Sequence, residues 1–188
     1  MEKNFNLNKY LQSYITQADV FNEEECKYLI NFAENKTEKT SILPDNNFYG
    51  ANAKVIPVEN KEMSNIINSK LSQFINNINS RYYNFKISEL KELQIIKVSE
   101  NDFSDLHYDI GKGIKSTRKL SMIVFLSKID DYSGGQITFS LVGPEINARI
   151  QKHGSMLLFP SIKPYMSEPV LKGTRYTLVG WMHGDPFV

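Results

Sequence analysis

The chain has 188 residues, 41% of them hydrophobic, and its 22 basic and 21 acidic side chains leave a formal net charge of +1. A hydrophobic share of this size predicts a single globular domain over residues 1–188 rather than a disordered chain. The near-neutral balance argues against a nucleic-acid binder, and the one cysteine, Cys26, excludes an internal disulfide. No apolar run is long enough to span a membrane, and Met1–Tyr14 lacks the apolar core of a signal peptide, so we expect a cytoplasmic protein.

Two helices are predicted in the first half of the chain. Phe21–Asn35 has an apolar stripe at helical spacing, with Asn22 as its cap and Glu25 in the capping-box position. Val58–Ile78 carries a second, longer stripe. We expect residues 21–80 to be helical support without chemistry of their own.

A turn-rich stretch, Lys36–Lys54, separates these helices. It contains Phe48 and Tyr49, which would be unusual in a plain solvated linker. Long loops over rigid scaffolds often determine specificity. We therefore expect this loop to cover the mouth of a cavity and to help select the substrate.

From Glu89 onward the apolar period becomes that of strands. Gly and Pro residues punctuate a series of short segments. The strands that we expect are Leu93–Val98, Thr117–Ser127, Gln136–Val142, Ile146–Lys152, Ser155–Phe159 and Thr174–Met182. Many short strands after two helices predict a mainly β fold, a jelly roll over residues 89–188 with supporting helices.

The chemistry is centred on the sequence L-H-Y-D at Leu106–Asp109. In a strand, His107 and Asp109 would point to one face, because side chains two residues apart do so. An imidazole and a carboxylate form two thirds of the two-His-one-carboxylate site that holds non-haem Fe(II). An H-x-D triplet also occurs by chance as a surface ion pair, so the segments that follow it decide the interpretation.

Those segments are R-K-L-S-M-I-V-F-L-S, D-D-Y-S-G-G-Q-I-T-F, G-S-M-L-L-F-P-S and P-V-L-K-G-T-R-Y-T-L-V-G-W. Their order resembles that of the iron(II)/2-oxoglutarate-dependent oxygenases, in particular the prolyl-4-hydroxylase-like branch, from about Phe21 to Phe187. The resemblance implies a double-stranded β-helix, a cupin-like jelly roll whose mouth holds the metal. It implies Fe(II) and 2-oxoglutarate as cofactors, with ascorbate as a further candidate.

The resemblance also suggests roles for single residues. His107 and Asp109 match the first two iron ligands. Arg175 matches the basic residue that binds the far carboxylate of 2-oxoglutarate, and a guanidinium fork suits a carboxylate. Thr177 lies two residues on and can add a hydroxyl, and Trp181 would line the cavity.

Three positions depart from the family pattern. Tyr165 stands where the second His ligand is expected. Val98 stands near the place of a usual Tyr, and Phe125 occupies a position beside the cofactor that is usually polar. Polar groups near the cofactor thus become a phenol and two apolar side chains.

Tyr165 has three interpretations. It can bind iron as a phenolate, since a bound cation lowers the pKa of a ligand. Alternatively, His183, or His153 before Gly154, supplies the third ligand. In the third interpretation the metal site is degraded, and the pocket serves binding or another reaction.

We therefore expect an iron(II)/2-oxoglutarate-dependent oxygenase-like protein, a hydroxylase of an amino-acid or peptidyl C–H bond, with an altered metal site. His107, Asp109 and Tyr165 are the residues expected to carry the chemistry. The alternative is a non-catalytic or repurposed jelly-roll binding protein. A nucleic-acid demethylase is disfavoured because no basic stripe is visible. The expected partner is a small-molecule or peptide substrate, with neither nucleic acid nor membrane, and the sequence leaves the oligomeric state open.

Overall fold

The computed structural model describes residues 14–36, 53–139, 146–147 and 151–186. The predicted loop Lys36–Lys54, with Phe48 and Tyr49, lies almost entirely outside these residues. The helical elements are α2 (Glu23–Asn35), α3 (Lys61–Ile78), the π-helical turn η1 (Asn79–Tyr83) and the 3-10 turns η2 (Gly113–Thr117) and η3 (Ile129–Asp131). The strands are β1 (Ile15–Gln17), β2 (Lys54–Pro57), β3 (Ile87–Val98), β4 (Ser104–His107), β5 (Arg118–Phe125), β6 (Tyr132–Gly134), β7 (Ile137–Phe139), β8 (Ile146–Asn147), β9 (Met156–Pro160), β10 (Tyr165–Ser167), β11 (Val170–Gly173) and β12 (Arg175–Gly184).

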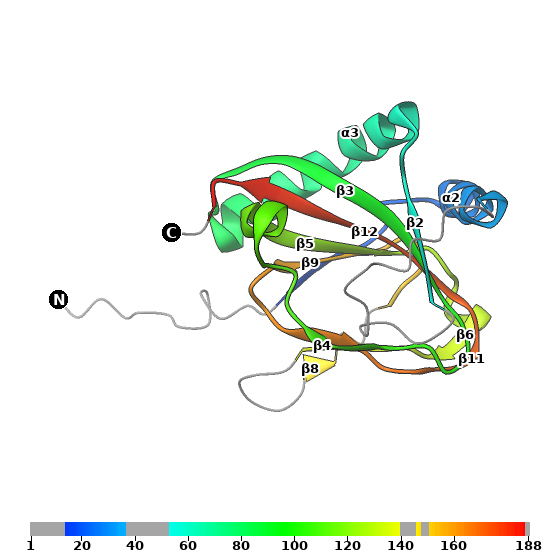
Figure 1. The fold of residues 1–188 in the computed structure, drawn as a ribbon. Helices are drawn as coiled ribbons and strands as arrows, with labels where there is room; N and C mark the ends of the chain where they lie inside the picture. Colours follow the sequence, from blue (N-terminus) through cyan, green and yellow to red (C-terminus); the bar gives the residue numbers. More distant parts are fainter. Residues whose placement is uncertain (1–13, 37–52, 140–145, 148–150, 187–188) are drawn as a thin grey trace.

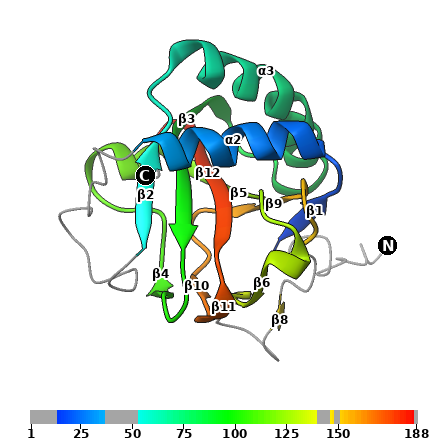
Figure 2. The same ribbon diagram turned by 90° about the vertical axis from the view of Figure 1, so that its right-hand side faces the viewer.

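The strands form two main antiparallel sheets that face each other. The larger sheet has the order β1-β9-β5-β12-β3-β2, the smaller one β4-β10-β7-β8, and β11 pairs with β6 in a short ribbon. Helices α2 and α3 cover the outer face of the larger sheet, and the smaller sheet lies below its other face (Figures 1 and 2). This is the jelly roll with helical support that the strand pattern predicts.

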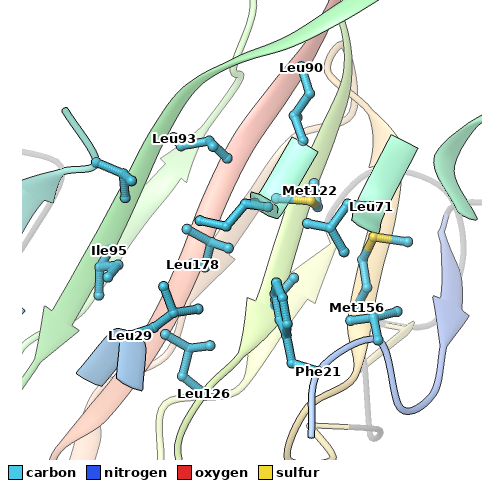
Figure 3. Packing of buried hydrophobic residues seen from close by; sticks show 14 of the residues in the cluster. Phe21, Leu29, Leu71, Leu90, Leu93, Ile95, Met122, Leu126, Met156 and Leu178 are labelled. Atoms are coloured by element: carbon cyan, nitrogen blue, oxygen red, sulfur yellow. The ribbon is translucent and has the colours of Figure 1, made fainter. Parts of the chain in front are cut away.

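The larger sheet separates two hydrophobic cores. One core lies between the helices and the sheet, where Leu29 and Leu71 pack near Met122 and Leu178 (Figure 3). The second lies between the two sheets and includes Phe159 and other aromatic side chains. Strand β5 is buried along its whole length, because both of its faces are covered. This explains why its sequence is apolar without alternation.

The helix boundaries follow from their caps. In α2 the Asn22 side chain accepts from the Glu25 amide at 2.9 Å, and the Glu25 carboxylate accepts from the Asn22 amide at 2.7 Å, as the capping-box pattern predicts. Helix α3 begins at Lys61 rather than at the predicted Val58, because Asn60 caps it. The Val58 amide instead donates to the Leu93 carbonyl.

Strand β3 is longer than predicted. It begins at Ile87 rather than Leu93, and its register against β12 shifts near Glu92. Glu92 has a φ of 56°, a left-handed conformation that few side chains adopt in a strand. This bulge breaks the alternation of apolar residues, so the first half of the strand has no simple period in the sequence.

Candidate active site

His107 and Asp109 come together at the end of the smaller sheet. Strand β4 ends at His107, and Asp109 lies in a bend just beyond it. The His107 Nε2 and Asp109 Oδ1 atoms are 3.9 Å apart, and both side chains are largely buried. The pair converges although only the first residue is in a regular strand.

The ring of His107 is oriented by the backbone of its own strand. Its Nδ1 lies 2.6 Å from the Asp105 carbonyl oxygen, and a carbonyl can only accept, so Nδ1 carries the hydrogen. In the neutral ring the lone pair is then on Nε2, the nitrogen that faces Asp109. Metal-binding histidines are commonly fixed by a carbonyl in this way.

The carboxylate of Asp109 is held mainly through one of its two oxygens. Ser121 on β5 donates its hydroxyl to Oδ2 at 2.5 Å, and the Ser121 hydroxyl is 2.9 Å from that of Ser161. This contact leaves Oδ1 directed at His107. A carboxylate fixed through one oxygen can offer the other to a cation.

Tyr165 completes this group from the neighbouring strand. It lies directly opposite His107 in the register of β10 and β4. The two rings are 4.4 Å apart between centroids, and the Tyr165 hydroxyl lies 3.4 Å from Asp109 Oδ1, a long and weak contact. Phe159 packs edge-on against the phenol. The phenol therefore stands beside both expected ligands.

These donors match a divalent metal in part. An imidazole nitrogen and a carboxylate oxygen converge, and a phenol oxygen is adjacent. Among the described residues, however, no group of three or more His, Cys, Asp or Glu side chains could hold a metal. The structure thus offers two strong donors with a phenol beside them.

The other two histidines do not join the group. His183, near the end of β12, has its Nδ1 2.7 Å from the Thr117 hydroxyl and its Nε2 3.0 Å from a Glu92 carboxylate oxygen. His153 lies in the turn before Gly154. Neither forms a cluster with His107 and Asp109 in the described part of the chain. The structure therefore does not support the interpretation in which either one supplies the third ligand.

Arg175 points into the space between the sheets and is only 3% exposed. It donates from Nη2 to the Ser167 hydroxyl at 2.8 Å and from Nη1 to the Gly135 carbonyl. Gly135 has a φ of 64°, and a Cβ on it would lie 3.2 Å from Arg175 Nη1, so the turn passes close to the guanidinium.

A small cavity of about 20 Å³ adjoins Arg175. Its lining is mostly apolar, with a few polar groups. The lining residues are Ile96, Ser104, Ile123, Ile137, Tyr165, Ser167, Arg175, Thr177 and Val179. Tyr165 is thus shared between this cavity and the His107–Asp109 group, and Arg175 and Thr177 line the cavity together as the strand parity predicts.

The cavity matches 2-oxoglutarate in its chemistry but not in its present volume. Arg175, Thr177 and Ser167 can bind a carboxylate. A space of this size holds about one water molecule. The side chains that line it, Tyr165 among them, must therefore move before a dicarboxylate of ten heavy atoms can enter.

The remaining predicted residues lie around these two sites. Val98 and Phe125 are buried in the core between the sheets, Val98 opposite Arg175 and Phe125 opposite Thr177. Trp181 is not in the cavity lining; its ring stacks under the guanidinium of Arg118, 3.6 Å from the ring centroid. Its buried indole N–H has no hydrogen-bond acceptor among the described residues.

Sequence reasoning missed the serines that hold this site. Ser121 is the only small polar residue inside the apolar strand β5, and that isolation is a signal that could have identified it. Ser161 and Ser167 gave no comparable signal, because both lie close to prolines, in a part of the sequence where serine is common in turns.

Residues 93–183 match the model of the 2OG-Fe(II) oxygenase superfamily. This match covers just under half of the chain. The predicted resemblance is therefore confirmed, and the matched range contains His107, Asp109, Tyr165 and Arg175.

Relatives in sequence are hydroxylases of one type. A PKHD-type hydroxylase of Synechococcus sp. (strain CC9902) is 30% identical over 96 residues, which cover 50% of this chain and 43% of that protein. Another, from Hyphomonas neptunium, is 34% identical over 87 residues, or 44% of this chain and 38% of that protein. The chain thus spans less than half the length of these curated relatives.

Solved structures of prolyl hydroxylases share the fold. A prolyl-4-hydroxylase of Pseudomonas putida superposes with a TM-score of 0.74 at 17% identity, covering 92% of this chain and 93% of that chain. A prolyl hydroxylase of Trichoplax adhaerens was solved with a peptide fragment of hypoxia inducible factor. It superposes with a TM-score of 0.72 at 16% identity, and the match covers 92% of this chain and 84% of that chain. The predicted double-stranded β-helix is confirmed.

Proposed function

We propose that this protein is an Fe(II)- and 2-oxoglutarate-dependent oxygenase that hydroxylates a substrate C–H bond, with His107 and Asp109 as its metal donors and Tyr165 in the third position. The convergence of these three side chains next to the Arg175 cavity carries the proposal. The match of residues 93–183 to the model of the 2OG-Fe(II) oxygenase superfamily supports it.

Each residue then has a defined task. Bound iron and 2-oxoglutarate would supply the activation of oxygen. His107 offers Nε2, because the Asp105 carbonyl occupies Nδ1, and Asp109 offers Oδ1, because Ser121 occupies Oδ2. Arg175 and Thr177 would bind the far carboxylate of 2-oxoglutarate. The aromatic side chains packed around Tyr165 exclude water from this centre.

The substrate would approach from the segment that follows Asp109. A hollow of about 470 Å³ lies there, lined by Tyr108, Ile110, Gly111 and Ser116. Tyr108 is 53% exposed, so an aromatic surface is available beside the proposed metal centre. We propose a peptide or a small molecule carrying an amino-acid C–H bond as the substrate.

A second candidate is a repurposed binding protein that lacks turnover. Two observations favour it, namely the phenol in third ligand position and a cavity of about 20 Å³ beside Arg175. In this case Arg175 would keep its contacts to Gly135 and Ser167 permanently, and the protein would not consume 2-oxoglutarate.

Formation of succinate separates the two candidates. The assay uses wild type, Tyr165→His and Arg175→Ala with Fe(II), ascorbate and 2-oxoglutarate under air. We expect slow succinate formation by wild type and faster formation by Tyr165→His, because an imidazole restores the third strong donor. In Arg175→Ala the rate should fall about tenfold or more, because the charged pair between the guanidinium and the cofactor is lost.

Other outcomes refute the leading proposal. If only Tyr165→His forms succinate, the wild-type protein is the repurposed binder. If no variant binds or converts 2-oxoglutarate, the oxygenase proposal fails altogether. A Ser99→Ala variant, on the loop after β3, is the matched control for handling and iron loading and should equal wild type.

A further inference from the structure

A charged cluster that is buried except at Glu92 lies next to the backbone of Asp109. Arg118, at the start of β5, makes a two-pronged ion pair with Glu92 on β3: Nε donates to Oε2 at 2.9 Å and Nη2 to Oε1 at 2.7 Å. The guanidinium stacks on Trp181, and His183 lies 3.0 Å from the same carboxylate. Arg118 is only 5% exposed. We call Glu92, Arg118, Trp181 and His183 the Arg118 cluster.

The cluster reaches the proposed metal centre through the main chain. Arg118 Nη1 donates to the backbone carbonyl of Asp109 at 3.1 Å, while the Asp109 amide donates to the Ser161 carbonyl at 3.2 Å. Asp109 lies past the end of β4, so it has no strand ladder to fix its backbone. These two contacts are what holds its peptide groups in place.

Glu92 enters the cluster through an unusual backbone. It sits where the register of β3 against β12 shifts, with a φ of 56°. A non-glycine residue in this region costs on the order of 1 kcal/mol or more, and such strain persists where the surrounding structure requires it. Bulges near active sites often redirect a side chain. Here the bulge turns the carboxylate of Glu92 inward, onto Arg118.

We propose that Glu92 and Arg118 are a positioning pair, which sets the backbone of Asp109 and thereby the direction in which its carboxylate faces the metal. The inference rests on the proposed metal centre. Glu92 fixes the guanidinium with two hydrogen bonds, and the remaining Nη1 donor fixes Asp109. A buried ion pair contributes little net stability against apolar replacement, so stability alone does not account for it.

The test measures binding of Co(II), used alone as an air-stable substitute for Fe(II). Glu92→Gln keeps the volume and removes the charge. Arg118→Lys keeps the charge but cannot contact Glu92 and the Asp109 carbonyl together. Glu89→Gln removes an exposed carboxylate from the same strand and is the matched control. Calorimetric titration gives the affinity, and visible absorption of bound Co(II) reports its ligand geometry.

We expect Glu92→Gln and Arg118→Lys each to weaken Co(II) binding about tenfold, the scale typical of residues that orient metal ligands, and to change the Co(II) spectrum. Glu89→Gln should match wild type. Titrations are made at temperatures where circular dichroism shows the variants to be folded. If Glu92→Gln does not fold at any temperature, Arg118→Lys decides the matter.

Wild-type affinity and spectrum in both cluster variants would overturn the positioning pair while leaving the metal centre intact. If wild type itself bound no Co(II), the proposed metal centre would fail, and the pair with it. A spectrum that changes equally in Glu89→Gln would also overturn the inference, because the effect would then be one of general charge.

Discussion

The ionisation of Glu92 affects the stability of the folded state near the site. Burial by itself raises the pKa of its carboxyl, but the hydrogen bonds and charge of Arg118, with a contribution from His183, outweigh burial and lower the pKa below its ordinary value of 4.5. A lowered folded-state pKa means that the carboxylate stabilises the protein above the unfolded pKa. This stabilisation is lost as the pH falls through the folded pKa.

Glu92→Gln should therefore flatten the acid side of the stability curve. We expect the melting temperature of wild type to fall more steeply than that of Glu92→Gln below about pH 4.5, because only in wild type does the unfolded chain take up a proton on this carboxylate more readily than the folded protein does. Scanning calorimetry from neutral pH to about pH 3 measures this, with Glu89→Gln as the control. Parallel curves for wild type and Glu92→Gln would show that the Arg118 ion pair does not contribute.

Among single residues, the sequence could predict those that belong to motifs in a recognisable order along the chain. His107, Asp109, Tyr165 and Arg175 could be placed together for that reason, and their roles remain predictions. Glu92 could not be found, because its side chain faces inward only through a bulge, and a bulge residue has no period in the sequence.

Among the elements, α2 depends most clearly on a local signal. Its cap residue Asn22 and the reciprocal contact of Glu25 satisfy two amides that the helix leaves unpaired. The same end of the helix is fixed to the turn that precedes β9, because the amides of Val20 and Phe21 donate to the Gly154 carbonyl. A cap and a tertiary contact thus define one boundary together.

Asn22→Ala should lower the free energy of unfolding by about 1 kcal/mol, the usual cost of losing an N-cap. Chemical denaturation measures it. The control is Asn31→Ala on the exposed face of α2, which should raise the free energy by a few tenths of a kcal/mol, since alanine favours the helix interior. Equal effects of both substitutions would show that the cap is unimportant.

Element types could be predicted better than their ends. The helices were evident from apolar spacing, and α3 starts late only because Asn60 provides a cap inside the periodic stretch. Short strands such as β2, β10 and β11 have too few residues to show alternation, so tertiary pairing determines them.

For the molecule as a whole, the larger sheet divides a structural core from a functional one. The helices and one face of the sheet enclose aliphatic side chains (Figure 3), whereas the other face carries Arg175, Thr177 and the aromatic residues of the site. In the described ranges no helix has the length and hydrophobicity needed to cross a membrane.

The fold could be predicted because the order of the motifs fixes it. The volume of the cavity could not, because it depends on how all the side chains pack, and the boundaries of the single domain remain a prediction.

An anaerobic Fe(II) titration of the whole chain tests whether His107 and Asp109 bind iron with Tyr165 beside them. We expect wild type to bind Fe(II) at one site, Asp109→Ala and His107→Ala to lose at least about tenfold in affinity, and Tyr165→His to gain about tenfold, because each strong donor contributes a substantial share of the binding. Fe(II) binding that is unchanged in Asp109→Ala and His107→Ala, or absent in wild type and in Tyr165→His alike, would contradict the account.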